Sequence, residues 1–171
     1  MTQPLQKVLA STDVASADHQ VVVFRLSSGH YAIDIQHVQE IVRMQEISTI
    51  PESDPCIEGV TNLRGRVVPV MDLRRRCAVP ETPPTADTRI VVVGSEQGVV
   101  GLMVDSVSEV LRIPSDQVDA PSDIVRGERN GYVTGVAKLK DRLICLLDLS
   151  RLVTTQLPDT SLAAVEVKDA A

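Results

Sequence analysis

The chain of 171 residues has few aromatic side chains: no tryptophan, one phenylalanine and two tyrosines. It also lacks an excess of positive charge, with 17 Lys and Arg against 23 Asp and Glu. Proteins that bind nucleic acids need basic grooves and aromatic rings on which bases stack. The composition therefore argues against a nucleic-acid platform, and the shortage of rings argues against a sugar- or flavin-stacking pocket.

The three cysteines lie far apart and form no C-x-x-C pair (Cys56, Cys77 and Cys145). This pattern disfavours a disulfide framework and indicates small apolar side chains in a reducing compartment. No apolar run approaches the roughly 18 residues of a membrane span, and the first residues do not resemble a signal peptide. We therefore expect a cytoplasmic protein.

Motifs of catalysis are also missing. The three histidines lack a metal-ligand spacing, and the chain contains neither a phosphate-binding loop nor a nucleophile elbow. We expect no catalytic residues, no metal and no cofactor. A small enzyme or ligand-binding barrel that uses a groove between subdomains as its pocket stays open as the alternative.

Valine is abundant, with 27 residues, and it favours β-structure. Short apolar runs alternate with turn signals and predict strands, most of them in hairpins. The expected strands are 21–26, 31–35, 40–44, 57–63 and 66–71, followed after a proline-rich connector by 89–93, 99–104, 107–113, 132–139 and 142–147.

The second half of the chain repeats the first. Residues 38–41 match 107–110, 69 positions later, and residues 59–66 match 135–142, 76 positions later. Two copies of a five-strand unit predict two small closed barrels related by a pseudo-two-fold axis, because closure removes the exposed edges of short strands. The expected fold class is mainly β, with a few short helices.

We expect the following organisation along the chain. A flexible N-terminal arm spans residues 1–19, one domain spans 20–153, and a C-terminal tail spans 154–171. The domain divides into subdomain 1 (about 20–77), a linker (about 78–87) and subdomain 2 (about 88–153).

Two segments, 21–23 and 90–93, are apolar at every position. Successive side chains of a strand point to opposite faces, so the outer face of these strands must be covered. Either the sister barrel or a partner could cover it. We expect part of this valine surface to stay unfinished until a partner binds.

Five arginines lie within 13 residues (Arg64, Arg66, Arg74, Arg75 and Arg76). They fit either a solvated face or a patch for an acidic partner. Arg64 can pair with Glu40 if the two strands that carry them are neighbours; otherwise the two are independent surface charges.

Several segments resemble the chemotaxis coupling protein family (CheW-like): 31–41, the G-V-T-N-L-R-G-R-V-V-P-V-M-D-L run of 59–73, 101–110, and 135–148. The resemblance implies two SH3-like β-subdomains. It also implies a non-enzymatic adaptor that couples chemoreceptor cytoplasmic tips to the regulatory domain of the histidine kinase CheA. Such an adaptor lies at receptor arrays and meets the membrane only through receptors. Some relatives serve twitching or other non-flagellar pathways, which is the alternative within the family.

Carried over by motif position, the resemblance also implies functional residues. The receptor-binding groove would be lined or shaped by Glu40, Arg64, Val107 and Val110, with Val38 near it. The apolar kinase contact would be formed by Val22, Ile35 and Ile50. Gly59 and Gly65 would meet backbone requirements at turns.

Overall fold

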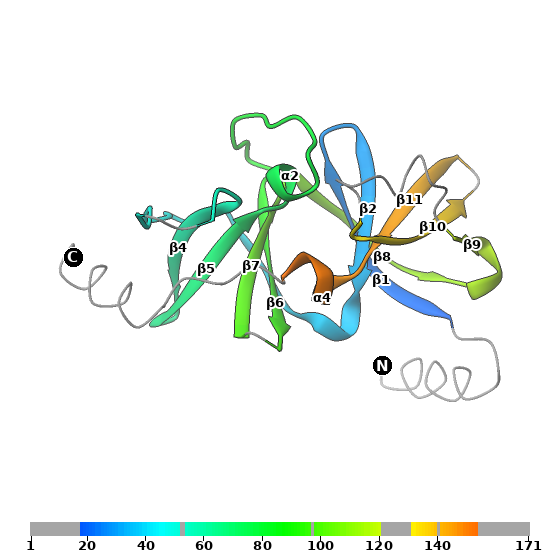
Figure 1. The fold of residues 1–171 in the computed structure, drawn as a ribbon, viewed down its shortest axis with the longest axis horizontal. Helices are drawn as coiled ribbons and strands as arrows, with labels where there is room; N and C mark the ends of the chain where they lie inside the picture. The colour runs from blue at the N-terminus through cyan, green and yellow to red at the C-terminus, as the bar shows by residue number, and fades with distance from the viewer. Residues whose placement is uncertain (1–17, 52–53, 97, 121–130, 140, 154–171) are drawn as a thin grey trace.

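The computed structural model describes residues 18–51, 54–96, 98–120, 131–139 and 141–153 (Figure 1). Strands dominate, and among the described residues no helix is long and apolar enough to cross a membrane. The elements are β1 (His19–Leu26), β2 (Gly29–Asp34), η1 (Ile35–His37), β3 (Val38–Arg43), β4 (Ile57–Leu63), β5 (Arg66–Asp72), α2 (Leu73–Arg76), β6 (Arg89–Ser95), β7 (Gly98–Val104), β8 (Ser106–Ile113), η2 (Ser115–Gln117), β9 (Val118–Asp119), β10 (Val133–Leu139), β11 (Arg142–Leu147) and α4 (Leu149–Leu152).

The expected hairpins form, and the β4–β5 turn shows why. Leu63 pairs with Arg66, which leaves Arg64 and Gly65 as a two-residue loop. Both have positive φ, 55° and 80°. A type I′ hairpin turn requires positive φ at both central positions, and glycine meets that requirement without strain. The turn requirement at Gly65 is therefore confirmed.

The strands form two sheets, ordered β8-β1-β2-β11-β10-β9 and β3-β6-β7-β5-β4. In Figure 1 they lie side by side, with α2 and α4 between them. The repeat maps β3 onto β8, the β1–β2 hairpin onto β6–β7, and β4–β5 onto β10–β11. Under this mapping the two strand orders are identical apart from β9. The duplication and the two SH3-like β-subdomains are thus confirmed, with a sixth two-residue strand in the first sheet.

The sheets correct the expected subdomain boundaries. The first sheet combines β1 and β2 with β8–β11, and the second contains β3–β7. The chain crosses between sheets at η1 and again at Asp105, so each half gives its first hairpin to the other half's last strands. The segment 78–87 joins α2 to β6 within one subdomain and is not a linker between two.

Each curved sheet gains a further pairing beyond its end strand. Ser48 pairs with Val60 of β4 through two backbone hydrogen bonds of 2.8 Å. At the matching place in the other half, Asp119 of β9 pairs with Val136 of β10. These pairings cover the free edges of β4 and β10, as a closed barrel requires.

Three apolar clusters fill the interior. One lies within the first sheet (with Val21, Val23 and Ile144), and one lies within the second (with Ile90, Val92 and Met103). The third and largest takes residues from both sheets, including Phe24, Leu26, Val91 and Val93. Alternate residues of β1 and β6 therefore point into their own barrel and into the junction.

These clusters show what covers the strands that are apolar at every position. Through the shared core, the sister subdomain covers Phe24 and Leu26 of β1 and Val91 and Val93 of β6. Val22 is also buried and is 1 % exposed. The expectation that these strands wait for a partner is wrong. Among the described residues, the large apolar side chains left exposed are Ile41, Val110 and Leu143.

Candidate partner-binding surface

Glu40 and Arg64 form an ion pair, one of the two alternatives that the sequence left open. Arg64 Nη2 lies 3.3 Å from Glu40 Oε1. Their strands are not neighbours: β3 and the β4–β5 hairpin stand at opposite ends of the sheet order, and the curved sheet brings them together. The Arg64 side chain is 82 % exposed, so the pair adds little stability and displays two charges at the surface.

A second pair of the same kind was missed from the sequence. Arg142 at the start of β11 pairs with Glu109 of β8. Glu109 matches Glu40 in the repeat, and Arg142 matches Arg66, two residues beyond Arg64. The repeat was the signal that could have revealed this pair. Both subdomains therefore carry a glutamate of the third strand held by an arginine of the last hairpin.

The predicted groove residues differ in exposure. Val38 and Val107, which match in the repeat, are half-buried against the shared core. Val110 is 50 % exposed, and its counterpart Ile41, which was not predicted, is 39 % exposed. Each exposed aliphatic side chain directly follows the ion-paired glutamate in its strand, so the two side chains point to opposite faces of that strand.

The predicted kinase-binding residues lie on three different elements. Ile35 lies in η1 and Ile50 in the segment before β4, and both are half-buried. Val22 lies in β1 opposite Val110 and is only 1 % exposed. A side chain so deeply buried cannot contact a partner, so the structure removes Val22 from the set.

Gly59 has a structural role of a different kind from Gly65. A Cβ atom at Gly59 would lie 2.2 Å from the carbonyl oxygen of Ser48, and φ is +153°. Glycine therefore permits the backbone of β4 to approach Ser48. The predicted backbone requirement is confirmed, although it lies in a strand and not in a turn.

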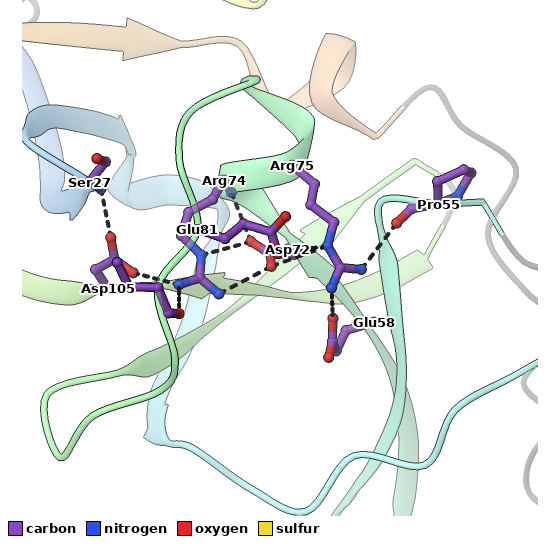
Figure 2. A network of polar contacts seen from close by, with 9 residues as sticks. Ser27, Pro55, Glu58, Asp72, Arg74, Arg75, Glu81 and Asp105 are labelled. Atoms are coloured by element: carbon purple, nitrogen blue, oxygen red, sulfur yellow. Dashed lines mark hydrogen bonds and ion pairs between the residues drawn. The ribbon is translucent and has the colours of Figure 1, made fainter.

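A buried ion cluster joins the two subdomains on one side of the junction (Figure 2). Arg74 of α2 donates from Nε and Nη2 to the two oxygens of Asp72, both at 3.1 Å. Its Nη1 donates to Asp105 Oδ1 at 3.0 Å and to the Thr82 carbonyl at 2.6 Å. We call Asp72, Arg74 and Asp105 the latch.

The latch also reaches the first sheet. Asp105 Oδ2 accepts the backbone N–H of Ser27, in the β1–β2 turn, at 2.6 Å. The Arg74 side chain is 4 % exposed and that of Asp72 is 0 % exposed. The Asp105 side chain is 21 % exposed. The latch therefore connects α2, the β1–β2 hairpin and the β7–β8 corner through a buried centre at Arg74 and Asp72.

The other arginines that follow Asp72 are also engaged. Arg75 pairs with Glu58 at 2.8 Å and with Glu81 at 2.9 Å. Arg76 donates to the Leu152 carbonyl, and its guanidinium lies 4.9 Å from the centre of the Tyr132 ring. The alternative of an arginine patch for an acidic partner is thus wrong for Arg74, which is internal.

The opposite side of the junction is open. A cavity of about 420 Å³ is lined by His37, three residues at the β6–β7 turn, and the start and end of α4. Its polar side chains include Glu96, Asp148 and Ser150. We call it the α4 crevice.

The cysteines offer no reactive thiolate. Cys56 and Cys145 pack against the shared core, in which Cys77 is buried. Burial raises the pKa of Cys77 to about 12 and also raises the pKa of Cys56 and Cys145. All three stay protonated near neutral pH, so they are poor nucleophiles. The part of the chain that the structure describes holds no group of His, Cys, Asp and Glu side chains suited to a metal.

Known proteins are similar to this chain in sequence and in fold. The family model of the CheW-like domain matches residues 20–157. The chemotaxis protein CheW of Klebsiella aerogenes is 34 % identical over 137 residues, which cover 80 % of this chain and 82 % of that protein. The protein FrzA of Myxococcus xanthus is 27 % identical over 143 residues, covering 82 % and 89 %.

The solved structure of the scaffolding protein TtCheW from Thermoanaerobacter tengcongensis superposes with a TM-score of 0.73 at 34 % identity. The match covers 82 % of this chain and 94 % of that one. Sequence and fold agree over the whole two-subdomain unit, and the chain belongs to the CheW-like family of chemotaxis coupling adaptors.

Proposed function

We propose that this protein is a non-enzymatic adaptor that binds chemoreceptor cytoplasmic tips and the regulatory domain of the histidine kinase CheA. The observation that carries the proposal is the surface ion pair Glu40–Arg64, which recurs as Glu109–Arg142, together with the exposed side chains of Ile41 and Val110 on the other face of the same two strands. Modest apolar patches with a charged rim suit reversible protein contacts. Because receptor tips are cytoplasmic, the proposal also locates the protein there, at receptor arrays.

The two partners would use different parts of the surface. The receptor's helical hairpin would dock where Val38, Val107 and Val110 provide apolar contact and Glu40 and Arg64 provide charge. This is a helix-in-groove mode, in which an apolar helix face meets an apolar groove. Ile35 and Ile50 remain the proposed kinase contacts.

Arg64→Ala tests the receptor surface. Since the side chain is 82 % exposed, its loss should lower the free energy of unfolding by less than about 1 kcal/mol. Binding of a receptor fragment should weaken roughly tenfold, equivalent to about 1.4 kcal/mol. The measurement is co-purification with the receptor fragment and CheA, followed by a kinase-activity assay.

Arg66→Ala is the matched control, because Arg66 is exposed in the same hairpin and forms no ion pair with a described residue. It should leave binding and kinase activation unchanged. Equal binding by Arg64→Ala and wild type would overturn the assignment of the surface. An absence of any receptor-dependent gain in kinase activity with wild type would overturn the proposed function itself.

The relative FrzA favours a second candidate, a coupling adaptor of a non-flagellar chemosensory pathway. The same surfaces would serve, with another receptor and kinase. Parallel assays with receptor fragments from flagellar and non-flagellar pathways would separate the two, since only the cognate pair should activate its kinase.

A further inference from the structure

Three side chains form a row along one face of β3. The register of β3 against β6 shifts between Val38 and Glu40, which marks a bulge. Because of this bulge, Val38, Ile41 and Arg43 project from the same face of the strand. Their partners on the neighbouring strand are alternate residues of β6, namely Val93, Val91 and Arg89.

The row leads from the junction to the surface. Val38 packs against the shared core, to which Val91 and Val93 belong. Ile41 is 39 % exposed, and Arg43 at the end of β3 is exposed. The row therefore begins at apolar side chains between the subdomains and ends at positive charge in water.

Two arginines face each other at the outer end of the row. Arg43 lies directly opposite Arg89 in the antiparallel pair, and like charges in that position destabilise a sheet. Arg89 Nη1 donates to the carbonyls of Ala86 and Thr88 at 2.8 and 2.9 Å. Neither arginine forms an ion pair with a described residue. The pair therefore leaves uncompensated positive charge beside the exposed side chain of Ile41.

The matching place in the other half is neutralised. Arg112 of β8 corresponds to Arg43, 69 positions earlier, and Gln20 corresponds to Arg89, 69 positions later. Arg112 lies opposite Gln20 and pairs with Asp18 at 3.1 Å. A single charge is enough to protect an edge strand from unwanted pairing. The second arginine and the missing carboxylate in the β3–β6 pair thus need another explanation.

We infer that Arg43 and Arg89 together bind the carboxylate of an acidic side chain on the receptor's helical hairpin. The inference rests on the proposed function and extends its receptor surface, since Val38 begins the same row. Guanidinium groups on neighbouring strands can donate charge-assisted hydrogen bonds to one carboxylate.

The spacing of the row suits a helix. Ile41 and Arg43 are two residues apart, about 7 Å along an extended strand, and one helical turn rises roughly 5.4 Å. A receptor helix that lies along β3 would place an apolar residue on Ile41 and an acidic residue, one turn further, on the two arginines.

A protein helix fits this surface better than a free anion or a lipid headgroup does. A small anion would make no contact with Ile41, although that side chain is 39 % exposed on the same face. Membranes attract broad basic segments, whereas this patch has two arginines in a chain with a net charge of −6.

The test measures binding of a receptor cytoplasmic-tip fragment to the full chain by isothermal titration calorimetry. Arg43→Gln and Arg89→Gln should each weaken binding about fivefold. The double variant should weaken it about tenfold, less than the product, because both arginines bind the same carboxylate. Arg25→Gln is the matched control and should bind as wild type does. Arg25 is exposed in β1 of the other subdomain and forms no ion pair with a described residue.

Exchange of charges separates binding from a structural defect. The chain that carries both Arg43→Glu and Arg89→Glu should lose binding of the receptor fragment. Each acidic residue of the fragment is then replaced by lysine in turn, and one replacement should restore binding to this chain. A misfolded chain would not be rescued in this way.

Unchanged affinity of the double glutamine variant would overturn the inference and leave the proposed function in place. The same holds if no lysine replacement restores binding, or if the arginine variants weaken binding of CheA and not of the receptor fragment. A wild-type chain that binds no receptor fragment would overturn the proposed function and this inference with it.

Discussion

Arg74 and Ser150 occupy matching positions in the two halves of the chain, yet they leave the two sides of the subdomain junction in opposite states. Around Arg74, the guanidinium and the Asp72 carboxylate are buried, and the Asp105 carboxylate is 21 % exposed. Around Ser150, two carboxylates line a cavity of about 420 Å³. Strand order, bulges and helix caps are shared by the halves, so the contrast arises from side chains.

The comparison shows that the same backbone arrangement can be closed by an ion cluster on one side of the junction and left open on the other. The shared apolar core already holds the subdomains together, so a single closed latch is enough to fix the junction on one side. A buried ion pair adds less net stability than its short distances suggest, because both groups lose their water. On the open side, Asp148 is paired with Arg151 and accepts the Ser150 hydroxyl, and no buried arginine closes the crevice.

The strongest test of the comparison removes the cation of the latch. Arg74→Met should lower the free energy of unfolding by about 3–5 kcal/mol, because it leaves the carboxylate of Asp72 buried without its partner. Urea unfolding followed by circular dichroism measures this loss.

Arg75→Met is the matched control for that variant. The Arg75 side chain is 36 % exposed; its shortest ion pairs are with Glu58 and Glu81, and Asp72 lies farther away, at 3.6 Å. Its loss should therefore cost about 1 kcal/mol, less than that of Arg74. Similar losses for the two variants would show that the latch is no stronger than a surface ion pair.

A second test compares matching glycines in β4 and β10. Gly59→Ala would bring Cβ to 2.2 Å from the Ser48 carbonyl oxygen, whereas in Gly135→Ala the nearest atom is Cγ1 of Val118, at 2.7 Å. Backbone cannot move aside as a side chain can, and only Gly59 has positive φ. Gly59→Ala should therefore cost roughly 1–3 kcal/mol and Gly135→Ala less.

Thermal unfolding of the two glycine variants provides the measurement, with wild type as reference. The same comparison reports on the two edge pairings, Ser48 with Val60 and Asp119 with Val136. A larger loss for Gly135→Ala would mean that the second-half edge is the more tightly packed of the two.

The sequence predicted the hairpins because each is a local pattern of apolar residues around a turn. The repeat predicted two subdomains, because it too can be recognised by comparing residues along the chain. The exchange of hairpins between halves could not be predicted, because nothing in the pattern of Val38–Arg43 says whether β3 pairs within its own half or with β6. The sheet that β3 joins depends on η1 (Ile35–His37), the short segment over which the chain passes from the first sheet to the second.

The candidate site was predicted in part. The Glu40–Arg64 pair was one of two alternatives left open, and it forms although the strands that carry the two residues are not neighbours, as that alternative had supposed. Val22 was misjudged because its burial in the folded protein, where it is 1 % exposed, leaves no local mark in the sequence. Arg74 looked like one of several surface arginines, since its partner Asp105 lies 31 positions away and meets it only in the folded chain.

The smallest expected effect concerns the charge of Asp148. Hydrogen bonds from the Ser150 hydroxyl and from backbone N–H groups hold the pKa of Asp148 below its ordinary value of 3.8. A depressed pKa stabilises the folded protein above the unfolded value of about 3.9, and this stabilisation is lost as pH falls through the folded value. Asp148→Asn keeps a side chain that can cap α4 but removes the ionisable carboxyl group.

Wild type should therefore be more stable than Asp148→Asn at pH 6, and the difference should shrink as the pH falls below about 4. Urea midpoints at pH 6, 4 and 3 measure it. A difference that stays constant over this range would mean that the carboxylate is not specifically stabilised in the folded state. A shrinking difference would show that Asp148 is ionised near neutral pH and that the hydrogen bonds at the start of α4 stabilise its carboxylate.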